Sequence, residues 1–184
     1  SKNMAVGGEG GMLTTTVSEL TDAVSLVVNH GRSPSLESMQ LGSNLRMSEV
    51  SAAIGTVQLK HLDNWVARRR AIAQQYNDAF ADLTLVATPK TRPGAKHAWH
   101  QYCLTTKYPD QLVNHLDSHG IDARRYYSTP CHKQAVFANH AQHNETLPIT
   151  DKLSNSLVAI PVMHELSDIE AQRVIEAVVT FSVN

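Results

Sequence analysis

The sequence predicts a mixed α/β fold, with a compact α+β unit from about residue 90 onward and an earlier segment that belongs to a larger structure. Three observations support this prediction. Segments with helical apolar spacing alternate with short strand-like segments. The 184 residues suffice for one small domain plus part of another. The first residues run directly into a glycine cluster, with no helix or strand before it.

The composition is that of a soluble globular protein. Hydrophobic residues make up 42% and charged residues 18%, which excludes a disordered tail. A net charge of -1 predicts neither a nucleic-acid nor a membrane partner. No apolar stretch is long enough to span a bilayer, and the N-terminus lacks the pattern of a secretory signal. The two cysteines indicate no disulfide framework, so we expect a cytoplasmic protein.

Local patterns predict the elements in order. In the first half we expect a strand over 12–15, a capped helix over 16–28 and a long helix from 48 that bends near 63–64. A strand over 97–106, a helix over 110–119 and a strand over 121–127 follow. After them we expect a loop over 128–148 that leads to a short helix, a buried edge strand over 158–161 and a final helix over 167–179. The strongest signal is the apolar stripe that begins after Ser48 and extends to Tyr76. Gly120 is a typical helix stop.

Lys2, followed by the glycine cluster at 7–11, is the first candidate for chemistry. A lysine that attacks a carbonyl group needs a neutral amine and a rigid backbone, and glycines let the chain approach a bound group closely. From spacing alone, an ordinary terminal lysine beside a turn is the better interpretation, because a single glycine cluster is a weak signal.

The histidines do not predict a metal site. His115 and His119 are four residues apart on a predicted helix, but no acidic or cysteine partner completes a ligand set. His97 and His100 would face opposite sides of a strand. We therefore expect histidines with packing or surface roles and no bound metal.

Several segments, in one order along the chain, resemble the StrS/DegT-type sugar aminotransferases. They are SKNM over 1–4, GEGGM over 8–12, NHGR over 29–32, LGSNLRMSE over 41–49, AAIG over 52–55, RRR over 68–70, HAWH over 97–100, GI over 120–121 with ARRYY over 123–127, and IP over 160–161. The resemblance covers essentially all 184 residues. It implies an enzyme that depends on pyridoxal phosphate.

The resemblance implies roles for individual residues. Lys2 matches the catalytic lysine that binds pyridoxal phosphate and transfers protons, while the cofactor ring acts as an electron sink. Asn44 matches an asparagine that binds the cofactor phosphate of the neighbouring subunit in a dimer, and its alternative interpretation is a loop-capping residue. Arg124, Tyr126 and Tyr127 match a segment at the substrate entrance, where guanidinium and hydroxyl groups suit a diphosphate and a sugar.

The four residues 124–127 cannot all face one site. Only alternate residues of a strand share a face, so at most half of them point into a binding site. For each of the four, a structural role is the alternative interpretation.

The resemblance starts at the cofactor lysine, so we expect the C-terminal portion of a fold-type I aminotransferase, with most of the large-domain sheet missing. Residues 1–60 are then a remnant of the large cofactor-binding domain with the start of the long helix. Residues 61–184 form the small α+β domain. Without the missing strands, residues 1–60 should expose an apolar surface.

Three hypotheses on function follow. In the first, the intact enzyme transfers an amino group from glutamate to a keto-sugar nucleotide, and this chain alone is inactive. In the second, the chain is a non-catalytic remnant that acts as an oligomerising or binding module. In the third, it is a related dehydratase, some of which carry histidine in place of the lysine, so Lys2 argues against it. The sugar, the carbon position, the nucleotide and the amino donor stay open.

Overall fold

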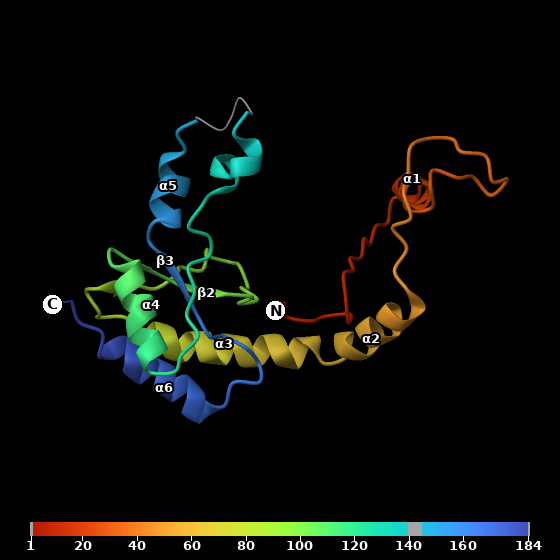
Figure 1. Ribbon diagram of the computed structural model, residues 1–184. Coiled ribbons are helices and arrows are strands. Elements are labelled where there is room, and N and C mark those ends of the chain that lie inside the picture. Colours follow the sequence, from red (N-terminus) through yellow and green to blue (C-terminus); the bar gives the residue numbers. More distant parts are fainter. Residues whose placement is uncertain (1, 140–144, 184) are drawn as a thin grey trace. The chain divides into compact units, whose positions relative to one another are not determined.

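The computed structural model describes residues 2–139 and 145–183 (Figure 1). The chain divides into two compact units, Ser1–Leu62 and Asp63–Asn184, which we call unit 1 and unit 2. Among the described residues, no helix has both the length and the apolar character needed to cross a membrane.

Unit 2 is built on an antiparallel sheet. Its strands are β1 (Val86–Ala87), β2 (Tyr102–Thr106) and β3 (Leu157–Ile160), in the order β1-β2-β3. Tyr102 pairs with Ile160, and Val86 pairs with Thr106. Alternation along β2 buries Tyr102, Leu104 and Thr106, so one face of the central strand lies in the core. The predicted buried edge strand at 158–161 is confirmed as β3.

Three helices supply most of the remaining core of unit 2. They are α3 (Leu62–Ala79), α4 (Pro109–Ser118) and α6 (Asp168–Val179). Helix α4 packs against both α6 and β3, which lie beside it in Figure 1. The fully buried side chains of these helices are Ile72, Ala73, Tyr76, Leu112, Leu116 and Ala171. The Tyr76 hydroxyl donates to the Pro161 carbonyl at 2.9 Å, which ties α3 to the chain after β3.

The ends of α4 and α6 follow the predicted signals. Gly120, with φ 71, lies just after α4, where the left-handed conformation ends a helix. At the start of α6, Ser167 Oγ accepts a hydrogen bond from the Glu170 backbone at 3.2 Å, and the Glu170 carboxylate accepts one from Ser167 N–H at 2.8 Å. The helices predicted over 110–119 and 167–179 are confirmed.

The segment between residue 127 and β3 contains two 3-10 helices and a short α-helix. They are η1 (Cys131–Lys133), η2 (Ala135–Phe137) and α5 (Pro148–Ser154). Helix α5 is the short helix predicted to follow the loop at 128–148. Residues 140–144 of that loop lie outside the described residues.

Unit 1 contains α1 (Ser18–Val28) and α2 (Glu49–Leu59), and neither helix buries a residue. Leu41 is 97% exposed and Met12 is 82% exposed. Apolar side chains of α2, including Val50 and Val57, are exposed as well. The predicted apolar surface on residues 1–60 is therefore confirmed.

Two predictions in the first half of the chain were wrong. Residues 12–15 form no strand, because no neighbouring segment pairs with them. The predicted cap before α1 is absent, since Val17 occupies the N-cap position without a side-chain hydrogen bond.

The long helix is interrupted at Lys60 and His61, slightly before the predicted bend, so that α2 and α3 are separate helices.

Two predicted strands were too long. Trp99 has φ 47, outside the extended region, so pairing in the 97–106 segment begins only at Tyr102. In the 121–127 segment, only Arg124 pairs, through one bridge to Ala159, because a turn follows at Tyr126. The two-residue strand β1 was not predicted.

Candidate functional site

Lys2 lies on a segment of unit 1 that is anchored to α2. Lys2 itself is exposed. Three residues later, the Ala5 N–H donates to Gln58 Oε1 at 2.7 Å. Val6 lies against Gly55, where an added Cβ would stand 3.1 Å from Val6 Cγ1. Gln58 and Gly55 both belong to α2, so residues 5 and 6, which follow Lys2, are held against that helix.

Asn44 follows a close approach between two backbone segments. A Cβ at Gly42 would stand 2.3 Å from the backbone nitrogen of Gly31, so no larger residue fits there. The Asn44 Oδ1 accepts a hydrogen bond from Arg46 Nε at 3.2 Å. This bond occupies Oδ1 and does not use Nδ2, which is the donor that an anion requires.

Arg124 is held by Asp122 and lies beside Tyr126. The Arg124 Nε donates to Asp122 Oδ1 at 2.9 Å, and Nη2 donates to Oδ2 at 3.0 Å. These hydrogen bonds lower the pKa of the Asp122 carboxyl and raise the pKa of the Arg124 guanidinium. Tyr126 also interacts with Arg124 and raises its pKa further. Asp122 and Arg124 are two residues apart on extended chain and so share a face, and Tyr126 lies beside Arg124 at the start of the turn.

Arg125 points toward different partners and has a structural role. Its Nη1 donates to Asp110 Oδ1 at 2.9 Å, and its Nη2 donates to the Ser154 carbonyl at 3.1 Å. It thereby connects the start of α4 to the end of α5. Arg124 and Arg125 therefore have different partners, as alternation along the segment predicts.

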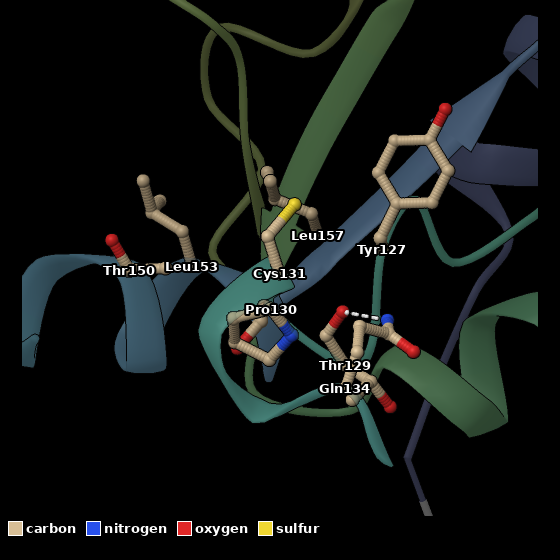
Figure 2. A pocket seen from close by; sticks show the side chains of 9 residues that line it. Tyr127, Thr129, Pro130, Cys131, Gln134, Thr150, Leu153 and Leu157 are labelled. Carbon is tan, nitrogen blue, oxygen red and sulfur yellow. Dashed lines mark hydrogen bonds between the residues drawn. The ribbon is translucent and has the colours of Figure 1, made fainter. Parts of the chain in front are cut away.

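Tyr127 stands at the edge of a cavity. Its side chain is 69% exposed, and its ring centroid lies 5.2 Å from that of Tyr126. The cavity has a volume of about 420 Å³ and is also lined by Cys131 and Leu157, as Figure 2 shows. The three candidate substrate residues therefore belong to one short segment of unit 2, whereas Lys2 and Asn44 belong to unit 1.

Sequence reasoning missed two charged residues of these sites. Asp122 precedes Arg124 by two residues, and Arg46 follows Asn44 by two. Opposite charges or hydrogen-bonding groups at that spacing on extended chain lie on one face, so the signal was present in the sequence.

His115 has the packing role predicted for it. Its Nε2 lies 2.8 Å from the Ala177 carbonyl oxygen of α6, and its ring centroid lies 4.5 Å from that of His119. Within residues 2–139 and 145–183, no three His, Cys, Asp or Glu side chains are grouped to hold a metal ion.

Solved structures show which class of fold this is. The sugar aminotransferase CalS13 from Micromonospora echinospora superimposes with a TM-score of 0.87 at 21% identity, over 96% of this chain and 48% of its own. DesV from S. venezuelae, solved with a ketimine intermediate, gives a TM-score of 0.85 at 32% identity, over 90% of this chain and 44% of its own. The fold is that of part of a sugar aminotransferase.

Sequence comparison gives the family. Residues 1–179 match the DegT/DnrJ/EryC1/StrS aminotransferase family, so the chain belongs to that family. A dTDP-3-amino-3,4,6-trideoxy-alpha-D-glucose transaminase from Streptomyces venezuelae is 32% identical over 177 residues, which are 96% of this chain and 47% of that protein. The chain thus spans about half the length of the curated relative it matches.

Proposed function

We propose that this chain is part of an enzyme that transfers an amino group from glutamate to a keto-sugar carried by a nucleotide, with pyridoxal phosphate as cofactor. The observation that carries the proposal is the exposed Lys2 on a segment fixed to α2, inside the family match. The S. venezuelae relative is a dTDP-sugar transaminase, which supports a dTDP-linked sugar as the substrate class.

The residues of unit 1 fit a cofactor that carries an aldehyde and a phosphate. Lys2 is exposed and carries a primary amine, which is the group that holds pyridoxal phosphate. The Oδ1 of Asn44 accepts a hydrogen bond from Arg46, so Nδ2 is the donor of this amide that suits a phosphate oxygen. We place Asn44 at the cofactor phosphate of a partner subunit in a cytoplasmic dimer.

When bound, pyridoxal phosphate supplies an electron sink for the carbon that exchanges its amino group. Lys2 holds the cofactor between turnovers and then moves the proton at that carbon, because an amine released from the cofactor can act as a general base. The anchoring of residues 5 and 6 to α2 limits the positions that this amine reaches.

Unit 2 supplies the binding groups for the rest of the substrate. Arg124 presents donors that Asp122 does not use, and Tyr126 adds a hydroxyl beside them. A guanidinium and a phenol side by side suit a diphosphate, since both donate to its oxygens.

The test is amino transfer by the enzyme that contains this chain, with glutamate and a dTDP-linked keto-sugar, followed by mass spectrometry of the sugar. We expect Lys2→Arg to lower turnover by about 10²- to 10⁴-fold, the contribution of a positioned acid–base group. Lys60→Arg, at an exposed lysine just after α2, is the matched control and should keep its activity. Absence of transfer, or transfer indifferent to Lys2→Arg, contradicts the proposal.

The exposed apolar residues of unit 1 favour a second candidate function, a non-catalytic module that oligomerises or binds another protein. Sedimentation of the chain at several concentrations tests it, with Leu41→Glu as the variant, because Leu41 is the most exposed of these side chains at 97%. Association that Leu41→Glu abolishes, together with no amino transfer, would favour this function over catalysis.

A further inference from the structure

A polar cavity of unit 2 lies where α4 ends beside α6, two helices that pack against each other (Figure 1). It has a volume of about 310 Å³, near the lower end of the usual range of roughly 300–1,000 Å³ for small-molecule sites. His119 comes from the end of α4. The other lining residues share one face of α6 and its C-cap at helical spacing, and they are Arg173, Glu176, Ala177 and Thr180. None of these residues has a role in the proposed amino transfer.

Arg173 and Glu176 bring opposite charges to the cavity, and both are exposed. Among the described residues, the Arg173 guanidinium takes part in no ion pair or hydrogen bond and acts on Glu170 only through its charge. Glu176 Oε1 accepts from Gln172 Nε2 at 3.1 Å, so Oε2 is the oxygen of this carboxylate that suits a ligand. The cavity therefore offers one cationic donor group and one anionic acceptor group.

His119 and Thr180 add hydrogen-bond acceptors. The His119 Nδ1 lies 2.8 Å from the His115 carbonyl oxygen, which only accepts, so Nδ1 carries the proton of the neutral ring. The other nitrogen, Nε2, is then an acceptor. The Thr180 hydroxyl donates to the Glu176 carbonyl at 2.9 Å, so its oxygen keeps lone pairs for a donor. Both side chains thus suit a ligand that brings N–H or O–H groups.

These groups select a small molecule that carries both charges. A simple anion would meet Arg173 but also the carboxylate of Glu176, and a simple cation would meet the reverse. An apolar molecule would cover both charged groups without pairing them. A zwitterion pairs both, because its carboxylate accepts from the guanidinium and its ammonium group donates to the carboxylate and to the imidazole of His119.

We propose that this cavity binds a free α-amino acid with a short polar side chain, whose carboxylate pairs with Arg173 and whose ammonium group pairs with Glu176 and His119. A hydroxyl side chain suits the Thr180 oxygen, and the small volume suits a molecule of this size. The amino acid is bound and not converted. The inference goes beyond the proposed function, because amino transfer uses none of these groups and the bound molecule is not the sugar substrate.

The test is a titration of the isotope-labelled chain with L-serine, followed by nuclear magnetic resonance. Pyridoxal phosphate is left out, so that cofactor chemistry at Lys2 plays no part. L-serine should shift the resonances of the Arg173 side-chain N–H and of His119, with a Kd on the order of 1 mM, the strength of two ion pairs at an exposed site. N-acetyl-L-serine lacks the ammonium charge and L-serinamide lacks the carboxylate, so each should bind about tenfold more weakly.

Two variants assign the two ends of the ligand. Arg173→Gln should weaken L-serine binding about tenfold and abolish the preference for L-serine over L-serinamide, since the carboxylate then has no cationic partner. Glu176→Gln should likewise abolish the preference for L-serine over N-acetyl-L-serine. A residue with a merely structural role would weaken all three probes equally. Arg92→Gln, at an exposed arginine outside the cavity, is the matched control and should bind as the wild type does.

Four results would overturn the inference: no binding of L-serine, equal binding of the three probes, binding that both cavity variants leave unchanged, or resonance shifts confined to unit 1. Amino transfer by the enzyme is measured separately. Transfer without L-serine binding would refute this site and leave the proposed function standing. L-serine binding without transfer would do the reverse.

Discussion

The carboxylate of Asp122 holds the guanidinium of Arg124 through two nitrogens, with Nε 2.9 Å from Oδ1 and Nη2 3.0 Å from Oδ2. Because Nη1 takes no part, the guanidinium keeps donors for a second anion. The side chains are 61% and 71% exposed, so the pair adds little to stability. Its effect is orientation, since it fixes Arg124 on the face that also carries Tyr126.

Asp122→Asn should weaken binding of dTDP about two- to fivefold, because a neutral amide orients Arg124 less firmly than a carboxylate does. Isothermal titration calorimetry measures the change. Asp110→Asn is the matched control, since Asp110 pairs with Arg125 at the same 2.9 Å and is similarly exposed, at 75%. Equal losses in the two variants would show that Asp122 has no special effect on Arg124.

The contribution of Asp122 should not vary across the neutral and mildly acidic range. Arg124 lowers the pKa of Asp122 below its ordinary 3.8, so the carboxylate is charged at every pH above that value. Its contribution is therefore complete above that pH and is lost only as the pH falls through the lowered pKa. The ratio of wild-type to Asp122→Asn affinity for dTDP should be the same at about pH 5 and about pH 8. A ratio that changes between them would refute this assignment.

Gly42→Ala should distort the loop that carries Asn44. The added Cβ would stand 2.3 Å from the Gly31 nitrogen and 2.7 Å from the Val27 carbonyl oxygen, a clash that costs about 1–3 kcal/mol. We expect faster proteolysis within residues 29–44 and weaker retention of pyridoxal phosphate. Gly11→Ala is the control, because nothing lies within 4 Å of its added Cβ. Equal behaviour of the two variants would contradict the packing described for Gly42.

Two Leu→Ala substitutions, one in the core of unit 2 and one on the surface of unit 1, should differ in their effect on the free energy of unfolding. Leu104 is 0% exposed on β2, so Leu104→Ala should lower the free energy of unfolding by about 2–5 kcal/mol. Leu41 is 97% exposed, so Leu41→Ala should change it by less than about 0.5 kcal/mol. Urea denaturation followed by circular dichroism gives both values. A large loss for Leu41→Ala would mean that Leu41 is buried in solution.

Local signals predicted the helices of unit 2 because those signals act within a few residues. The capping box of Ser167 and Glu170 and the stop at Gly120 are complete in the sequence itself. The strand predicted at 121–127 failed, because pairing depends on a distant partner and on the turn at Tyr126. Alternation along the chain contains neither piece of information.

The candidate site, too, was predicted only in part. The resemblance supplied Lys2, Asn44, Arg124, Tyr126 and Tyr127, and alternation explained why Arg124 and Arg125 have different partners. The cavity beside Tyr127 was not predicted, because its walls come from segments about twenty residues apart that meet only in the folded unit. Gln134 and Ser154, which line it, donate to backbone carbonyls, and composition does not reveal those bonds.

The most direct test of the central claim, that Lys2 is the cofactor lysine, is covalent trapping. The chain is incubated with pyridoxal phosphate, reduced with borohydride, digested and mapped by mass spectrometry. We predict one stoichiometric adduct at Lys2, which Lys2→Ala removes and Lys60→Ala does not. Labelling scattered over exposed lysines such as Lys60 and Lys90, or no labelling, would contradict the assignment.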